Sequence, residues 1–180
     1  MMDICTLDAL SAEVAPAAFS LLKRHLDNWH EVRGLGRFPY LIELFTKSDP
    51  PTQRSLVVID IERESCQPTR LVGTWFVEFF GVDPTGADFL QSATKEVRGI
   101  FLETHRRLAQ EPIGKFHISV CSTSSGRELQ VYGLALPYLR KGDLPCAAWL
   151  LVPDTTMNFG ECGSQVRAVT KQSWIKMSED

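Results

Sequence analysis

Three extended segments follow one another between residues 114 and 153, and they constrain the fold more than any other feature of the chain. The first, GKFHISVCS, alternates in polarity as a strand does when each of its faces meets a different environment. SSGRE and RKGDLP separate the three segments and are typical of hairpin turns. CAAWLLVP is apolar without alternation, as expected of a strand covered on both faces. The sequence therefore predicts an antiparallel meander of strands at 114–122, 129–139 and 146–153.

The alternation in the first strand divides its side chains between two faces of the predicted sheet. One face would carry Phe116, Ile118 and Val120, and the other would carry His117, Ser119 and Cys121. His117 and Cys121 thus share a face, but two possible metal ligands without a third do not define a metal site.

The N-terminal half predicts one long helix and one hairpin. Residues 11–33 carry an apolar stripe at three- and four-residue steps, and Gly34 is placed to end the helix. The stripe consists of Ala18, Leu22, Leu26, Trp29 and Val32. In the connector that follows, DPP at 49–51 is expected to exclude regular structure. Residues 55–62 and 69–74 then predict an antiparallel hairpin.

Two helices are expected between this hairpin and the meander. Thr74 is placed to cap a short helix that Gly81 would end, and DPTG at 83–86 has the residues of a type I turn. Residues 93–110 predict a longer amphipathic helix. This order of elements is typical of an α+β domain with one antiparallel sheet. The polar, aperiodic C-terminal segment is expected to be loosely held or to pack irregularly.

Composition excludes several classes of function. The chain has 180 residues, enough for one domain with a sizeable core. A net charge of −3 and a pI of about 5.8 give no general attraction to nucleic acid or anionic lipid. The five cysteines are widely spaced without a CxxC pair, which indicates neither a disulfide framework nor a zinc site. No apolar run is long enough to span a membrane. We therefore expect a cytoplasmic protein that binds neither nucleic acid nor a membrane.

Catalytic motifs are not apparent in the sequence. It contains no G-x-S-x-G nucleophile elbow, and the two adjacent serines at 124 and 125 lie in a predicted turn. GLGR follows a helix and lacks the remaining glycine of a dinucleotide-binding loop. We therefore expect no enzymatic activity and no catalytic residue.

The segment RLVGTWFVEFFGVDPTGADF resembles the second strand, first short helix and D-x-T-G turn of PAS domains. The similarity is greatest to a stand-alone bacterial PAS family. In that family a helix that ends with an aromatic residue and R-G precedes the first strand, and NWHEVRG at the end of the predicted N-terminal helix matches this pattern. ALPYL near residue 137 is similar to the final-hairpin segment of that family. The resemblance covers roughly residues 20–153. The connector at 40–54 departs from the family pattern, and so does the turn SSGRELQ, which lacks an aromatic residue after its glycine.

This resemblance implies a particular architecture. It implies a PAS fold with a five-stranded antiparallel sheet in the order 2-1-5-4-3, and with short helices and one long helix on one face. The chain would consist of an N-terminal helical extension (1–36), a PAS core (37–153) and a polar C-terminal tail (154–180).

The resemblance also implies a function. The chain would be a cytoplasmic sensor or adaptor that binds a small ligand or a partner protein and signals through protein contacts. Its ligand pocket would be lined by Trp75, Phe79, Phe101, His105 and Ile118. Three alternatives to this function remain open. In haem-binding PAS proteins a histidine on the long helix ligates the iron, so the first alternative is a haem sensor that binds through His105, and no other cofactor is implied. The second is a small α+β enzyme with an apolar pocket, and the third is a docking protein with a filled core.

The N-terminal helix leads to a further expectation. The helices of a PAS core leave the other sheet face uncovered, and an exposed apolar stripe on the N-terminal helix would favour association. The helix and the uncovered face can bury each other within one chain or across a two-fold dimer. Of the two arrangements, we expect the homodimer.

Overall fold

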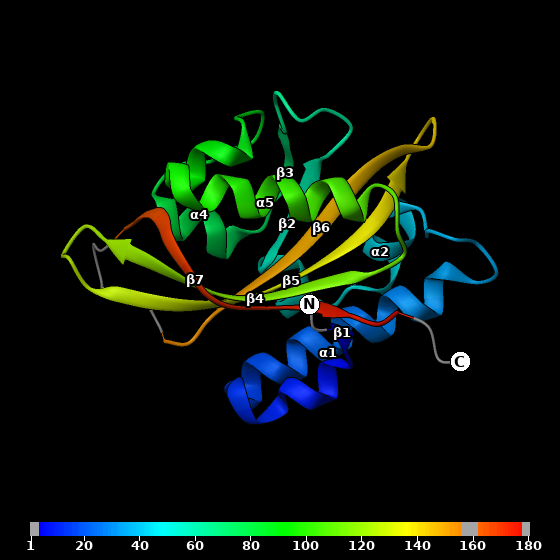
Figure 1. Ribbon diagram of the computed structural model, residues 1–180, viewed down its shortest axis with the longest axis horizontal. Helices are drawn as coiled ribbons and strands as arrows, with labels where there is room; N and C mark the ends of the chain where they lie inside the picture. The colour runs from blue at the N-terminus through cyan, green and yellow to red at the C-terminus, as the bar shows by residue number, and fades with distance from the viewer. Residues whose placement is uncertain (1–3, 156–161, 178–180) are drawn as a thin grey trace.

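The computed structural model describes residues 4–155 and 162–177, apart from the side chains of Phe80 and Ser164. A single twisted sheet forms its middle layer, with helices on both sides (Figure 1). The strands are β1 (Ile4–Cys5), β2 (Leu56–Asp60), β3 (Thr69–Val72), β4 (Gly114–Thr123), β5 (Glu128–Arg140), β6 (Leu144–Pro153) and β7 (Gly163–Ile175). The α-helices are α1 (Pro16–Arg33), α2 (Leu41–Lys47), α3 (Pro50–Arg54), α4 (Thr74–Phe80) and α5 (Lys95–Leu108). Two 3-10 helices, η1 (Leu7–Glu13) and η2 (Phe89–Ser92), complete the set.

The sheet has the strand order β1-β7-β4-β5-β6-β2-β3. The strands that the sequence predicts are β2 to β6, and they lie in the order 2-1-5-4-3, each antiparallel to its neighbours. Two further strands extend the sheet beyond β4, because β7 pairs with β4 and β1 pairs in parallel with β7. The sheet is therefore mixed and seven-stranded, and the prediction of a five-stranded, purely antiparallel sheet is wrong on both points.

The C-terminal segment does not pack irregularly, because residues 163–175 form β7 along the length of β4. Bulges shift the register between the two strands at several points. As a result Val166 and Val169, an odd number of residues apart, both pack on the same side of the sheet. A regular strand would place them on opposite faces. The bulges thus remove the two-residue period by which a strand is recognised in a sequence.

The connector after α1 also contains regular structure, contrary to the prediction for DPP at 49–51. Asp49 is the N-cap of α3, and its carboxylate accepts a hydrogen bond from the backbone N–H of Thr52 at 3.1 Å. Pro50 and Pro51 occupy the first turn, where a backbone N–H has no partner within the helix. The two prolines therefore begin this helix.

The short helix α4 covers the predicted residues, but its N-cap is Gly73 and not Thr74. The backbone of Arg54 lies so close that a Cβ at Gly73 would overlap it. The chain therefore needs a glycine at the point where β3 ends and α4 begins. Gly81 ends the helix in the left-handed conformation with φ 71°, as predicted.

The turn after α4 lies one residue later than the sequence predicts. The N–H of Ala87 donates to the carbonyl of Pro84 at 2.9 Å, which closes a turn over residues 84–87. Gly86 is its third residue and has φ 85°. A positive φ at that position is the requirement of a type II turn, not of type I.

The two faces of the sheet are covered by different helices (Figure 1). We call the side under α1 the α1 face, and its core includes Leu22, Trp29, Leu56, Phe116 and Leu150. We call the other side, under α4, η2 and α5, the α5 face, and its core includes Phe79, Phe101, Leu129, Trp149 and Leu151. Within residues 4–155 and 162–177, no helix is long and apolar enough to cross a bilayer.

Helix α1 buries its apolar stripe against the sheet of its own chain. Ala18, Leu22, Leu26 and Trp29 are buried and Val32 is half-buried. The indole N–H of Trp29 donates to the carbonyl of Pro137 on β5 at 2.7 Å, which fixes the helix to the sheet. The stripe was the reason to expect a homodimer, and because it is buried within one chain it provides no surface for a second copy.

Candidate ligand site

Strand alternation in β4 decides which side chains reach the α5 face. His117, Ser119 and Cys121 point to that side, whereas Phe116 and Ile118 belong to the core of the α1 face. Ile118 is therefore separated by the sheet from the other four residues predicted to bind ligand. The period of two in β4 already predicts this separation.

A cavity of about 30 Å³ lies between the α5 face and the helices that cover it. Its aromatic walls are Trp75, Phe76, Phe89, Phe101 and Trp149. Its polar lining is Ser92, His117, Ser119 and Cys121, and its aliphatic lining is Val131, Leu151 and Val166. Of the five predicted ligand-binding residues, Trp75 and Phe101 line this cavity. Phe79 packs beside it, with its ring 5.2 Å from that of Trp75.

His105 lies behind the cavity wall in a hydrogen-bonded chain. The indole N–H of Trp149 donates to Nε2 of His105 at 2.8 Å, so Nε2 accepts and the proton of the neutral ring is on Nδ1. Nδ1 in turn donates to Oε1 of Gln67 at 2.6 Å. Burial lowers the pKa of His105 to about 3, which keeps the ring neutral. His105 therefore orients Trp149, a wall of the cavity.

This arrangement does not fit haem. The lone pair of His105 Nε2, which iron would need, already accepts the hydrogen bond from Trp149. Nδ1 carries the proton donated to Gln67. A cavity of about 30 Å³ also has no room for a porphyrin ring.

His117 on β4 and Trp149 on β6 lie on either side of β5, and their rings stack on each other. The ring centroids are 4.6 Å apart and the planes are inclined by 27°. Gly133 on β5 is directly opposite His117, and a Cβ there would overlap the imidazole. The pKa of His117 is lowered to about 3, first by burial, then by the charge of Lys115 and, when His105 is protonated, by the charge of His105. Gly133 thus leaves the space that lets a neutral imidazole form part of the cavity wall.

Two polar atoms at the cavity have no protein partner. Nδ1 of His117 and Oγ of Ser119 are buried, and neither has a hydrogen bond to any part of the chain that the structure describes. The hydroxyl of Ser92, by contrast, donates to the carbonyl of Phe89 at 2.7 Å. Leaving a buried donor or acceptor unpaired is unfavourable by about 1–3 kcal/mol. The cavity therefore offers two hydrogen-bonding positions to whatever occupies it.

The thiol of Cys121 also faces the cavity, and burial raises its pKa to about 12. It is thus a neutral thiol near pH 7, as His117 is a neutral imidazole, and the pair is not an activated nucleophile and base. Within the two described segments, no group of three or more histidine, cysteine or acidic side chains could hold a metal ion.

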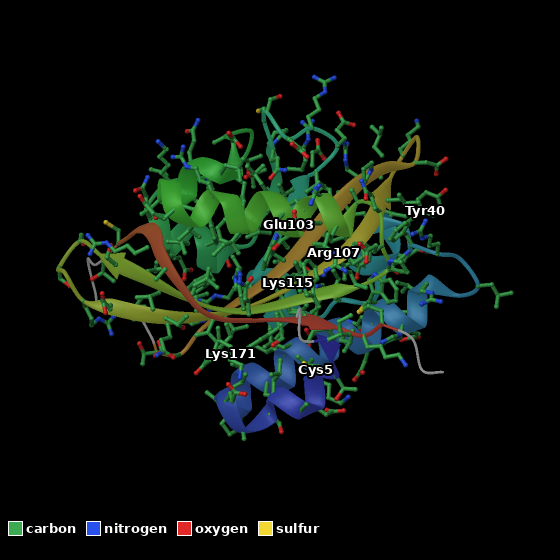
Figure 2. All side chains as sticks on the ribbon, viewed as in Figure 1. Cys5, Tyr40, Glu103, Arg107, Lys115 and Lys171 are labelled. Carbon is green, nitrogen blue, oxygen red and sulfur yellow. The ribbon has the colours of Figure 1, made fainter. Side chains whose placement is uncertain are left out.

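A cationic cluster lies at one end of the α5 face, where α5 meets the first residues of β4 (Figure 2). Nζ of Lys115 and the guanidinium carbon of Arg107 each lie 4.1 Å from the centroid of the Trp174 ring. Arg107 also pairs with Glu111 at 2.7 Å. Burial, followed by the charge of Arg107, lowers the pKa of Lys115 to about 8. None of these side chains lines the cavity, so the cavity walls themselves carry no charge.

A larger cleft of about 310 Å³ adjoins the cavity on the outside. Phe76, Phe89 and Ser92 line both spaces, and the exposed side chain of Val82 lies at the outer cleft. The shared residues form the wall between the buried cavity and the surface cleft, between α4 and η2.

Sequence reasoning missed most of the cavity. Ser119 and His117 are predictable as neighbours on one face of β4, but the sequence does not show that helices enclose that face. Trp149 lies in an apolar run without alternation, so its face could not be assigned. Val166 is on β7, the strand that the sequence did not predict.

Comparison with known proteins finds no family model that matches the chain, and no curated protein that matches it. Among solved structures, the PAS domain of BvgS from Bordetella pertussis is similar. It is 21% identical over a match that covers 59% of this chain and 81% of that chain, with a TM-score of 0.45.

Proposed function

We propose that this chain is a sensor domain of the PAS type that binds a small molecule on the α5 face of its sheet. The observation that carries the proposal is the cavity between β4, α5 and β6, lined by aromatic rings and by two buried polar atoms without a partner. A site that is mostly apolar with a few convergent polar groups is the usual form of a small-molecule site. The order of β2 to β6 in the sheet also agrees with the PAS resemblance of the sequence.

Binding would be passed to a partner protein through the helices that cover the site. Phe101 on α5, Phe89 on η2 and Trp75 on α4 all contact the cavity, so an occupant touches each of these elements directly. A ligand shifts a conformational equilibrium only through contacts that differ between the two states. The partner is therefore expected to bind the outer surface of α4 or α5, and the chain is expected to act in the cytoplasm and not as an enzyme.

Mass spectrometry of material released from the denatured protein tests this proposal. We expect a small organic molecule in about equimolar amount from the wild-type protein. The Cys121→Trp variant, which fills the cavity, should release none. Ile42→Trp is the matched control, because Ile42 is an exposed residue of α2 that lines neither the cavity nor the outer cleft. Release of no compound from the wild-type protein, or of the same compound from the Cys121→Trp variant, would contradict the proposal.

A further inference from the structure

We propose that the ligand of the cavity is an uncharged, flat molecule that carries one hydroxyl group, such as a phenol. This inference rests on the proposed function and specifies the chemical class of the ligand. It follows from the partnerless polar atoms, the absence of charged side chains in the lining of the cavity and the sizes of the two adjoining spaces.

The hydrogen-bonding positions select a hydroxyl group. Ser119 Oγ and His117 Nδ1 lie on the same face of β4, two residues apart, and neither finds a partner in residues 4–155 or 162–177. The serine hydroxyl can donate or accept, while Nδ1 does one or the other according to the tautomer of the ring. A ligand hydroxyl both donates and accepts, so it can satisfy both atoms with either tautomer of His117.

The walls disfavour an anionic ligand, because no charged side chain lines the cavity and the one charged side chain at the outer cleft is the carboxylate of Asp88. His117 and Cys121 are neutral near pH 7, and no lysine, arginine or carboxylate lines the cavity. A carboxylate or phosphate placed there would lose its water without gaining an ion pair, which is strongly unfavourable. Lys115, a cation close enough to lower the pKa of His117, has its amino group over Trp174, outside the lining.

The size and shape of the two spaces favour a flat body. The buried cavity of about 30 Å³ holds about two water molecules, which is enough for a hydroxyl group but not for a whole ligand. The remainder must extend between Phe76 and Phe89, which line both the cavity and the cleft of about 310 Å³. An aromatic ring fits this position because it can stack against either phenylalanine.

Three probes of similar shape separate these contributions. Phenol is uncharged and has the hydroxyl, toluene lacks the hydroxyl, and benzoate is charged. We expect titrations followed by methyl NMR to show binding of phenol, weaker binding of toluene and no binding of benzoate. In the Ser119→Ala variant, phenol should bind about 2- to 13-fold more weakly, the range for loss of one hydrogen bond. Toluene should bind this variant as it binds the wild-type protein.

Ser173→Ala is the matched control, because Ser173 is a buried serine paired with Phe116 and is not among the cavity residues. It should leave the affinity for phenol unchanged. The toluene titration of Ser119→Ala shows that the variant is folded with its cavity intact. Equal affinities for phenol and toluene, or binding of benzoate as tight as that of phenol, would overturn the hydroxyl class while leaving a small-molecule site in place. If none of the three probes binds, the inference is also wrong, and the compounds released from the denatured protein decide separately on the proposed function.

Discussion

Both faces of the sheet carry buried aromatic rings, but the core of the α1 face is mainly aliphatic, whereas the α5 face has a cavity lined by five aromatic residues and His117. Partnerless polar atoms alone do not distinguish the two faces. Nδ1 of His25 and the hydroxyl of Tyr138 on the α1 face also lack a partner within the described parts of the chain. The difference is the cavity, because neither His25 nor Tyr138 lines any of the cavities described above. We therefore propose that the α1 face stabilises the fold and that the α5 face binds the ligand.

The largest effect is expected from removal of the helix that covers the α1 face. A fragment of residues 36–180 lacks Leu22, Leu26 and Trp29, and burial of each such side chain contributes about 1.5–3 kcal/mol. Whole domains are stable by only about 5–15 kcal/mol. We expect this fragment to be unfolded or aggregated by circular dichroism and light scattering, while a fragment that lacks only residues 1–3 stays folded. A soluble monomer of residues 36–180 with an unchanged melting temperature would contradict the structural role of α1.

Acid should destabilise both faces, because each contains a buried neutral histidine. The pKa values are lowered to about 4 for His25 and to about 3 for His105 and His117, in each case mainly by burial. Between these values and the ordinary pKa near 6.5, the unfolded chain binds protons that the folded chain does not, so stability falls as the pH falls. Well below pH 6.5 each histidine contributes about 1.4 kcal/mol per pH unit, and because an unfolded imidazole is only half protonated at pH 6.5, the three together give a loss of about 5 kcal/mol between pH 6.5 and 5.

Urea unfolding at pH 7, 6 and 5 measures this loss. The His117→Phe variant keeps a ring that can stack on Trp149 and should reduce the pH dependence by about one third. Equal unfolding free energies of the wild-type protein at pH 7 and 5 would show that the histidines are not buried as the structure places them.

A smaller effect is expected at the hydrogen-bonded chain behind the cavity. Gln67→Ala leaves the Nδ1 proton of His105 without its acceptor, which should reduce the free energy of unfolding by about 1–3 kcal/mol. It should also change the near-ultraviolet circular dichroism of Trp149, because His105, which accepts the hydrogen bond from the indole, is no longer held in place by Gln67. Gln130→Ala at an exposed position on β5 is the control and should change neither quantity. If both variants behave alike, His105 does not orient Trp149 through Gln67.

The smallest effect is expected for substitution of one cysteine on each face of the sheet, measured as a change in the free energy of unfolding. Cys146 is packed in the core of the α1 face, so the extra volume of Cys146→Val should destabilise the protein by about 1 kcal/mol. Cys121 lines the cavity, so Cys121→Val should change the stability by less than about 0.5 kcal/mol. Chemical unfolding of the two variants measures the difference. Equal destabilisation by both would indicate that the α5 face is packed as fully as the α1 face.

The sequence predicts the parts of this structure in which local pattern and tertiary position agree. The strands β2 to β6, the helix α4 with Gly81 at its end, and the buried stripe of α1 all have regular periods or clear end signals. The sequence does not predict β7, because bulges against β4 disturb its alternation. The prediction for residues 49–51 is also wrong. Two consecutive prolines usually indicate that no helix is present, but here they form the first turn of α3, which Asp49 caps.

The candidate site is less predictable than the fold. Trp75 and Phe101 could be identified from the family resemblance, and both line the cavity. Ile118 could have been rejected from the alternation of β4 alone. The partner of His105 could not be predicted, because Trp149 and Gln67 are distant in sequence and their contacts depend on how α5 lies over the sheet.

One measurement tests the assignment of the two faces most directly. Leu150 and Leu151 are neighbours on β6, and their side chains belong to the α1 face and the α5 face respectively. With methyl-labelled protein and added phenol, we predict intermolecular nuclear Overhauser effects from the phenol ring protons to the methyl groups of Leu151 and Val131, and none to those of Leu150. Effects at Leu150 without effects at Leu151 would place the ligand on the α1 face and contradict the account.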